Sequence, residues 1–235
     1  MSDITSDWIT LGEAGGRRFE AYRALPASGR GTGILILHDM FGITPPFRDL
    51  AEAYARRGFP TLVPNQFWRA DQAGTLSYET GHAEANARLA AFDFDRAVDG
   101  MTLSLAALRR LASCDGKVVA LGFCFSGRLA YLAAARTDVE AAIGFYALGI
   151  SHHVAEAGAI TCPLQLHYGL ADEHVPQAEI DAVASALKGR PNVALHLYEG
   201  AGHSFFNPVR PMYDPTASAL AARRIDALLA RVAGG

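Results

Sequence analysis

The sequence predicts an α/β fold in which helices cover both faces of a mostly parallel central sheet. Short apolar runs alternate with segments of helical character along most of the 235 residues. Such runs are typical of strands that are buried on both faces. Because consecutive parallel strands are joined by right-handed crossovers through a helix, this alternation favours a parallel sheet. The chain has no internal repeat and no linker-like stretch, so we expect a single domain over residues 1–235.

The strands of this sheet are expected in a series of short runs that are mostly apolar and rich in β-branched residues. The runs are TGILILHD (32–39), FPTLVPN (59–65), KVVALGFC (117–124), AAIGFYA (141–147), PLQLHYG (163–169) and NVALHLYEG (192–200). Ahead of them, residues 8–25 are expected to form a leading antiparallel strand or hairpin.

Helices are expected between these runs, where proline and glycine mark the boundaries. One helix is expected from Pro45 to near Gly58, and another from Pro176 to just before Gly189. The last is expected to begin at Asp214, a good N-cap residue that is followed by a proline.

One long stretch, residues 77–112, is expected to be mainly helical. Asp99 and Gly100 lie inside it, and glycine is unfavourable in the interior of a helix. We therefore expect the stretch to be broken near these two residues.

The composition is that of an ordinary globular protein and excludes several classes of partner. Half of the residues are hydrophobic, 19% are charged, and the net charge is −3. A nucleic-acid partner or an anionic membrane would require a basic surface, so neither is expected. The longest uncharged apolar run, roughly residues 141–150, is well short of the ~18 residues that a membrane span needs.

The N-terminal segment and the cysteines predict a cytoplasmic protein. The segment MSDITSDWIT lacks the basic and apolar regions of a signal peptide. The three cysteines, Cys114, Cys124 and Cys162, have neither disulfide nor metal spacing. A reducing compartment fits this pattern.

The segment VVALGFCFSGRLA (118–130) places a cysteine between two glycines, where an apolar strand gives way to small, helix-forming residues. Cys124 would then stand at a tight strand-to-helix turn, which is where α/β-hydrolases hold their nucleophile. Such a turn brings backbones close together, and Gly122, Ser126 and Gly127 are small enough for it. The N-terminus of the following helix favours the reactive thiolate. The alternative is that Cys124 is a buried core thiol.

A cysteine nucleophile needs a histidine base and a carboxylate that orients the base. In α/β-hydrolases the acid follows the nucleophile along the chain, and the histidine follows the acid. Asp172 comes after the run that ends at Gly169, and His203 comes after the run that ends near Gly200. Loops at the carboxyl ends of parallel strands build the sites of α/β proteins. The sequence therefore predicts a triad of Cys124, His203 and Asp172.

Several neighbouring residues offer competing interpretations. The alternative for Asp172 alone is a helix-capping role. The alternative for His203 alone is a turn residue beside a glycine. Glu173 is a second candidate for the orienting acid, whereas His174 is expected on a surface loop. Ser126 lies two residues beyond the nucleophile position and is expected to face the packing side.

No metal site is expected. The adjacent residues His152 and His153 suggest a metal at first sight. Neighbouring side chains diverge, however, and no further ligand lies at a suitable spacing. We expect a solvated loop there.

Backbone N–H groups are expected to stabilise the oxyanion that forms when the nucleophile attacks a carbonyl. One belongs to the residue after the nucleophile, Phe125. The other belongs to the loop after the early central strand, where the sequence LHDMFG favours Met40. Because the backbone donates, the side chains at these positions matter little.

Taken together, the motifs resemble those of the dienelactone hydrolase (carboxymethylenebutenolidase) family. The motifs are LHDMFGI, GFCFSG, GLADEHVP, GAGHSFFNP and RPMYDPTA, and they occur in order between about residues 8 and 232. The resemblance implies an α/β-hydrolase fold, no cofactor, and the triad Cys124, His203 and Asp172. It also implies that a small-molecule lactone or ester is hydrolysed through a cysteine acyl-enzyme. We expect a monomer or a small homo-oligomer.

The departures from the family pattern bear on the substrate. The family carries a glutamate that activates the thiol at the position of Asp39, which is one methylene shorter. It also holds the substrate carboxylate with two arginines, and the matching positions here are His82 and Asn207. An aromatic pair of the family's pocket is replaced by Asn86 and Leu89. Neither His82 nor Asn207 is a permanent cation, so neither provides the bidentate clamp that a carboxylate prefers.

We therefore expect a neutral or larger ester or lactone rather than the small anionic dienelactone. The loop NQFWRADQAG (65–74), which follows the second strand, is expected to line the entrance. The candidate substrate contacts are His82, Asn207, Ser204, Phe67, Trp68 and Arg69, the last as a possible replacement for the lost cations.

Two functions of other classes stay open. The altered residues Asp39, His82 and Asn207 would also suit a non-catalytic ligand-binding protein on a hydrolase fold. Cys124 would suit a thiol redox sensor, although no resolving cysteine lies at an obvious spacing.

Overall fold

The computed structural model describes residues 4–70 and 73–234, which fall into two compact units. Unit 1 comprises Met1–Val119 and unit 2 comprises Ala120–Gly235. Strand β5 (Cys114–Phe123) runs from the first unit into the second. The expectation of a single domain stays a prediction.

The sheet of unit 1 begins with the expected hairpin. Strands β1 (Thr5–Ala14) and β2 (Arg17–Leu25) pair antiparallel, and the turn between them consists of two glycines with positive φ, a conformation that glycine adopts without strain. Strand β4 (Thr61–Pro64) pairs antiparallel with β2 and parallel with β3 (Gly31–Leu37). The run Ile34–Leu37 is fully buried, as expected of a strand covered on both faces.

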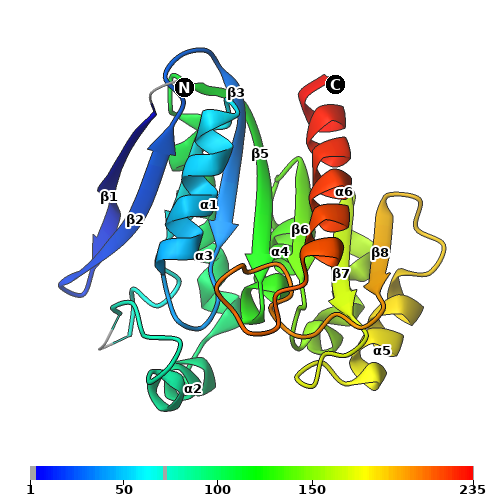
Figure 1. Cartoon of the computed structure of the whole chain (residues 1–235). Helices are drawn as coiled ribbons and strands as arrows, with labels where there is room; N and C mark the ends of the chain where they lie inside the picture. Colours follow the sequence, from blue (N-terminus) through cyan, green and yellow to red (C-terminus); the bar gives the residue numbers. More distant parts are fainter. Residues whose placement is uncertain (1–3, 71–72, 235) are drawn as a thin grey trace. The chain divides into compact units, whose positions relative to one another are not determined.

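The described part of unit 1 contains the helices α1 (Pro45–Arg56), α2 (His82–Ala90) and α3 (Phe94–Arg109). Helices α1 and α3 pack against its strands from opposite faces (Figure 1). The start of α1 at Pro45 agrees with the sequence, because proline suits the first turn of a helix.

The predicted helix break near Asp99 and Gly100 is wrong, because α3 continues through both residues. The break lies just after α2, where Asp93 caps α3 by accepting the backbone N–H of Arg96 at 2.9 Å. A Cβ atom at Gly100 would lie 3.4 Å from the ring of Phe19, an ordinary van der Waals distance, so the helix tolerates this position without a break.

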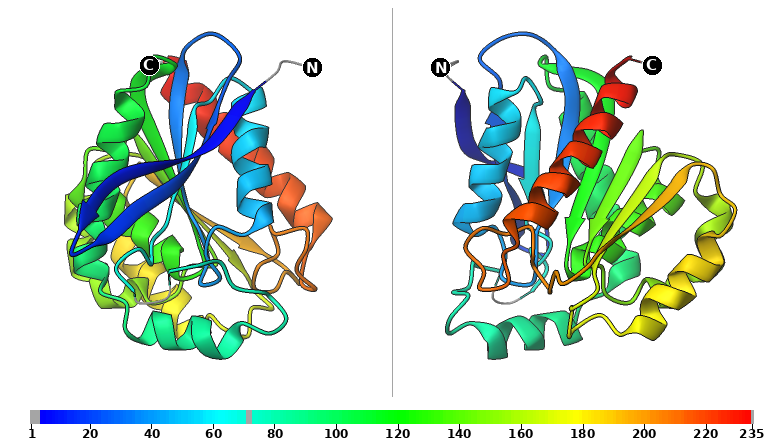
Figure 2. Two further views of the ribbon diagram at one scale, coloured as in Figure 1. Left: turned by 90° about the vertical axis from the view of Figure 1, so that its left-hand side faces the viewer. Right: turned by 45° about the vertical axis from the view of Figure 1, so that its right-hand side comes forward.

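Unit 2 contains the parallel strands β6 (Ala141–Phe145), β7 (Leu164–Gly169) and β8 (Val193–Tyr198), paired in that order. Helix α4 (Phe125–Arg136) packs against β6. Helix α6 (Pro215–Gly234) lies over the other face of these strands (Figure 2). The side-chain amide of Gln165 in β7 donates to the backbone carbonyl of Arg224 in α6 at 3.3 Å.

The remaining elements of unit 2 are α5 (Gln177–Leu187) and the 3₁₀ helix η1 (Ile150–Ala159). The expected solvated loop at His152 and His153 is wrong, because both residues lie in η1. His152 is exposed, whereas His153 is half-buried and its Nδ1 lies 3.2 Å from Oε1 of Glu156.

In the part of the chain that the structure describes, no helix combines the length and the apolar character needed to cross a membrane.

Candidate active site

Cys124 occupies the turn between β5, which ends at Phe123, and α4, which begins at Phe125. Its backbone has φ 59° and ψ −127°, a conformation that strongly favours glycine and costs other residues about 1–3 kcal/mol. Two backbone hydrogen bonds hold the turn. Cys124 donates its N–H to the carbonyl of Phe145 at 3.1 Å, and Gly127 donates to the carbonyl of Cys124 at 2.9 Å. The strained residue is therefore kept in place by its neighbours.

The small residues around Cys124 make this turn possible. A Cβ atom on Gly122 would overlap with the carbonyl oxygen of Ser126, and one on Gly127 would lie 2.6 Å from the Cβ of Ala147. Ser126 is fully buried, so it faces the packing side as expected. The sequence requirement for small residues at these positions is thus explained by backbone contacts.

His203 and Asp172 lie in the loops that follow β8 and β7. Nδ1 of His203 is 2.8 Å from Oδ2 of Asp172. The other oxygen of this carboxylate accepts the backbone N–H groups of His174 and Val175, at 2.8 and 3.2 Å. The Asp172 side chain is 1% exposed, whereas Glu173, the competing acid, is exposed. Asp172 therefore both caps its own turn and orients the histidine.

Cys124 also acts on the imidazole of His203, through its effect on the pKa of that ring. Burial by itself lowers the pKa of His203. The hydrogen bonds with Asp172 and Cys124 and the negative charge of both groups outweigh burial, and they raise this pKa to about 10. The arrangement thus favours a protonated His203 imidazole that is oriented by Asp172. The structure brings the three predicted triad side chains together, and their catalytic roles stay predictions.

Backbone strain is concentrated around this histidine. Among the described residues, the non-glycine residues with positive φ are Cys124, Tyr146 (38°) and Ser204 (64°). Tyr146 directly follows β6, and its ring centroid lies 4.9 Å from that of His203. The ring of His174 meets the same imidazole edge-on at 4.9 Å. Strained residues cluster at functional sites in many proteins. Tyr146 was missed by the sequence analysis, although its place after a strand was a usable signal.

The two expected oxyanion donors lie in different units. Phe125 is the first residue of α4, directly after Cys124. Met40 is half-buried in the turn after β3. Asp39 beside it is 6% exposed, and its carboxylate accepts the N–H of Phe41 at 2.9 Å and the hydroxyl of Tyr78 at 3.2 Å. The functional roles of Met40 and Asp39 stay predictions.

The expected substrate contacts differ in how exposed their side chains are. His82 is exposed at the start of α2, and its ring meets that of Phe41 edge-on at 5.0 Å. Asn207 and Ser204 are buried in the loop after His203, and Oδ1 of Asn207 accepts the N–H of Val209.

The expected entrance loop of unit 1 largely faces its own core. Phe67 and Trp68 are 3% and 5% exposed, and Trp68 stacks on Phe19 with ring centroids 4.9 Å apart. The guanidinium of Arg69 lies over the Trp68 ring at 4.1 Å. Residues 71–72 of this predicted loop lie outside the described residues.

Comparison with known proteins assigns the chain to a family. The family model described as "Dienelactone hydrolase family" matches residues 19–233. The chain belongs to the dienelactone hydrolase family. This result confirms the predicted family and the prediction of a dienelactone hydrolase-like ester or lactone hydrolase.

Relatives in the dienelactone hydrolase family match nearly end to end. Carboxymethylenebutenolidase of Pseudomonas sp. (strain P51) is 30% identical over 233 residues, which is 97% of each chain. Carboxymethylenebutenolidase 1 of Cupriavidus pinatubonensis is 30% identical over 231 residues, again 97% of each chain.

Solved structures with lower identity confirm the fold. The dienelactone hydrolase-like promiscuous phosphotriesterase P91 from metagenomic libraries has a TM-score of 0.79 at 21% identity, covering 97% of this chain and 98% of its own. Esterase 2 of Thermogutta terrifontis phosphorylated by paraoxon has a TM-score of 0.73 at 20% identity, and the match covers 97% of this chain and 94% of the esterase chain. The predicted α/β-hydrolase fold is therefore confirmed.

Proposed function

We propose that this member of the dienelactone hydrolase family cleaves a lactone or carboxylic ester through an acyl-enzyme on Cys124. The observation that carries the proposal is the cysteine on a strained strand-to-helix turn, together with a histidine that Asp172 orients and whose pKa Cys124 raises. A core cysteine would need neither a strained backbone nor an oriented histidine.

In the proposed reaction, His203 takes the proton of the Cys124 thiol and the sulfur attacks the substrate carbonyl carbon. Backbone N–H groups of Phe125 and Met40 stabilise the resulting oxyanion. The carbon–oxygen bond to the leaving alkoxide then breaks, and His203 donates its proton to that oxygen. Water, deprotonated by the same histidine, attacks the thioester and releases the carboxylic acid and the free thiol. Throughout, Asp172 holds the imidazole and stabilises its positive charge.

Asp39 is proposed to assist the thiol, as the glutamate at the matching position does in the family. Its carboxylate is buried and held by the N–H of Phe41 and the hydroxyl of Tyr78. Asp39→Asn keeps the shape of the side chain and removes its negative charge. If that charge assists the thiol, the substitution should lower kcat/KM for a poor substrate. An Asp39→Asn enzyme with unchanged kcat/KM would assign Asp39 to structure alone.

The preferred substrate is proposed to be neutral or larger than the anionic dienelactone. The support is the chemistry at the two positions where the family has arginines, since His82 is exposed and Asn207 uses its carbonyl oxygen within its own loop. The test compares kcat/KM for a dienelactone with that for a neutral short-chain aryl ester. A clear preference for the dienelactone would contradict this part of the proposal.

The same site would also suit a non-catalytic ligand-binding protein or a thiol redox sensor. One experiment distinguishes these from the hydrolase. If Cys124→Ala abolishes ester turnover and leaves the fold and ligand affinity intact, both alternatives fail. If wild type hydrolyses no ester or lactone in a broad panel and responds only to oxidants, the sensor is supported instead.

The proposal also covers the location and assembly of the enzyme. We propose that it is cytoplasmic and is a monomer or a small homo-oligomer, with no nucleic-acid or membrane partner.

A further inference from the structure

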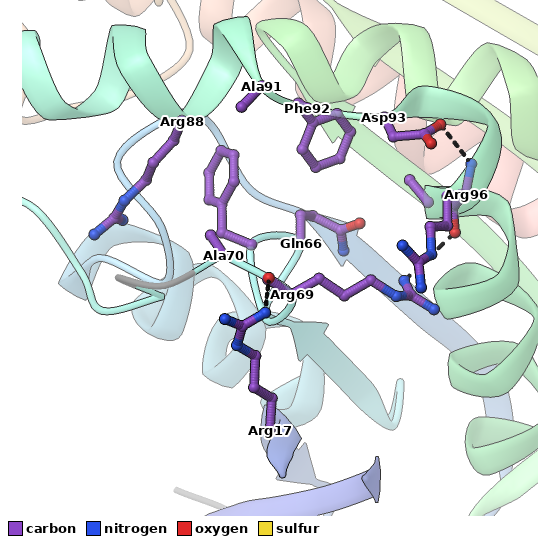
Figure 3. Close-up of a pocket in the computed structure, with 11 residues that line it drawn as sticks. Arg17, Gln66, Arg69, Ala70, Arg88, Ala91, Phe92, Asp93 and Arg96 are labelled. Atoms are coloured by element: carbon purple, nitrogen blue, oxygen red, sulfur yellow. Dashed lines mark hydrogen bonds between the residues drawn. The ribbon is translucent and has the colours of Figure 1, made fainter. Parts of the chain in front are cut away.

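Unit 1 contains a cavity of about 440 Å³ that none of the proposed triad residues lines. Its walls come from β2, the segment after β4, the end of α2 and the start of α3 (Figure 3). The volume lies within the roughly 300–1,000 Å³ range of small-molecule sites. The lining is notable for its charge, because its described residues include Arg17, Arg69, Arg88 and Arg96 and one carboxylate, Asp93.

Arg88 does not contribute to this charge, because it forms an ion pair with Glu84. Arg69 and Arg96 differ from it. Among the residues that the structure describes, neither of these guanidinium groups forms an ion pair with a carboxylate. Nη1 of Arg69 donates to the backbone carbonyl of Arg96 at 3.4 Å, which orients the group without neutralising it. In Figure 3 the side chain of Arg69 extends toward Arg96, whereas the guanidinium of Arg88 points away from both.

The two like charges act on each other. Burial lowers the pKa of Arg69, the charge of Arg96 lowers it further, and the carboxylates of Asp99 and Asp93 oppose the change. Two neighbouring cations in a partly desolvated cavity repel each other, so a bound anion between them would be stabilised.

Arg69 is also fixed in position before any ligand arrives. Its guanidinium lies over the ring of Trp68 at 4.1 Å, and Trp68 is itself buried and stacked on Phe19. A stacked guanidinium keeps the N–H groups along its edge available for a planar oxyanion. Such preorganisation reduces the entropy lost on binding.

The cavity offers apolar surface beside this charge. Phe92 and Phe67 line it, with their rings edge-to-face at a centroid distance of 5.5 Å. A ring or short chain of a ligand has contact surface there, within reach of the two arginines.

We propose that this cavity binds a small organic anion, with a carboxylate or phosphate group held between Arg69 and Arg96 and an apolar body against Phe92. This site is additional to the proposed hydrolytic one and shares none of its triad residues. Binding of the anion to this cavity should therefore persist when Cys124 is replaced by alanine.

The test measures binding to the Cys124→Ala protein by calorimetry, so that no turnover interferes. Benzoate and phenyl phosphate are the anionic probes, and benzamide is the neutral probe of similar shape. At least one anion should bind saturably, benzamide should not, and added salt should weaken binding. Comparing the two anions decides between carboxylate and phosphate.

Two variants assign the binding to this cavity. Arg96→Gln and Arg69→Gln should each raise Kd by at least about tenfold, because each removes charged hydrogen bonds. Arg110→Gln is the matched control, since Arg110 is an exposed arginine at the end of the same helix and does not line the cavity. Its Kd should equal that of the parent protein.

Thermal unfolding shows whether each variant is folded, so that a loss of binding can be assigned to the substituted arginine. Without ligand, Arg96→Gln should melt no lower than the parent, because it removes a like-charge contact. The proposal is overturned if neither anion binds at millimolar concentration, if benzamide binds as well as the anions do, or if well-folded Arg96→Gln and Arg69→Gln proteins bind unchanged.

Discussion

Nδ1 of His203 lies 2.8 Å from Oδ2 of Asp172, and the other oxygen of that carboxylate already accepts two backbone N–H groups. A carboxylate fixed on both oxygens has one orientation available to it. The carboxylate therefore favours a proton on Nδ1 of the imidazole, and in the proposed mechanism Nε2 exchanges a proton with the thiol.

Asp172→Asn tests this relationship. Asparagine retains an oxygen for the two backbone N–H groups but favours the wrong imidazole tautomer, so the fold should persist while kcat/KM falls by about 10³–10⁴. Glu173→Gln, at the exposed neighbouring acid, is the control and should leave the rate unchanged. A large loss in Glu173→Gln and a small one in Asp172→Asn would reassign the orienting acid.

Replacing Gly122 should disrupt the turn that carries Cys124. A Cβ atom there would overlap with the backbone carbonyl of Ser126, so Gly122→Ala should destabilise the protein by roughly 3 kcal/mol or more. Gly158→Ala is the matched control, because a Cβ atom at Gly158 meets nothing within 4 Å. Urea denaturation measures the stability of both variants. Equal midpoints for the two variants would show that the turn is not tightly packed.

The strain at Cys124 predicts that glycine at this position is more stable than alanine. Cys124→Gly relieves the unfavourable φ of 59°, whereas Cys124→Ala keeps it. After the entropy cost of glycine is included, the glycine variant should be more stable than the alanine variant by about 1 kcal/mol. Both should lack ester turnover. An alanine variant as stable as the glycine variant would show that the turn stores no strain.

His38 predicts a loss of stability in acid. Its ring is fully buried, with Nδ1 2.7 Å from the carbonyl oxygen of Asp39 and Nε2 accepting the N–H of Gln66 at 2.9 Å. Burial, reinforced by the charge of Arg88, lowers the pKa of His38 from 6.5 to about 4. Between these two values the unfolded chain takes up a proton that the folded chain does not.

The free energy of unfolding should therefore fall as the pH drops from 6.5 to about 4, by up to about 3 kcal/mol from this group. Above pH 6.5 His38 should contribute no pH dependence. His196 shifts in the same direction, so the informative quantity is the difference between wild type and His38→Gln, measured by urea denaturation across this range. Identical slopes for the two proteins would contradict the assignment.

The local geometry of the candidate site was largely predictable from the sequence because its requirements are local. The turn at Cys124 needs small residues at fixed offsets, and Gly122 and Gly127 meet that need through contacts within a few residues or with the next strand. Asp172 and His203 follow strands that the apolar runs identify, and parallel strands bring their following loops to one edge.

What the sequence concealed depends on contacts between distant segments. Gly100 suggests a helix break, yet α3 continues through it and packs at this position beside Phe19, which is far away in the chain. The positive φ of Tyr146 is imposed by its surroundings and has no signature in its residue type. The arginine cavity was invisible for the same reason, since Arg69 and Arg96 are 27 residues apart and meet only in the folded unit.

The most direct test is to trap the acyl-enzyme. Wild type is mixed with an activated aryl acetate, quenched in acid during the first turnovers, and measured by intact mass spectrometry with peptide mapping. The proposed mechanism predicts a mass increase of one acetyl group on Cys124, absent in Cys124→Ala and longer-lived in Asp172→Asn. Ester turnover with no acetyl group on Cys124, or turnover undiminished in Cys124→Ala, would contradict it.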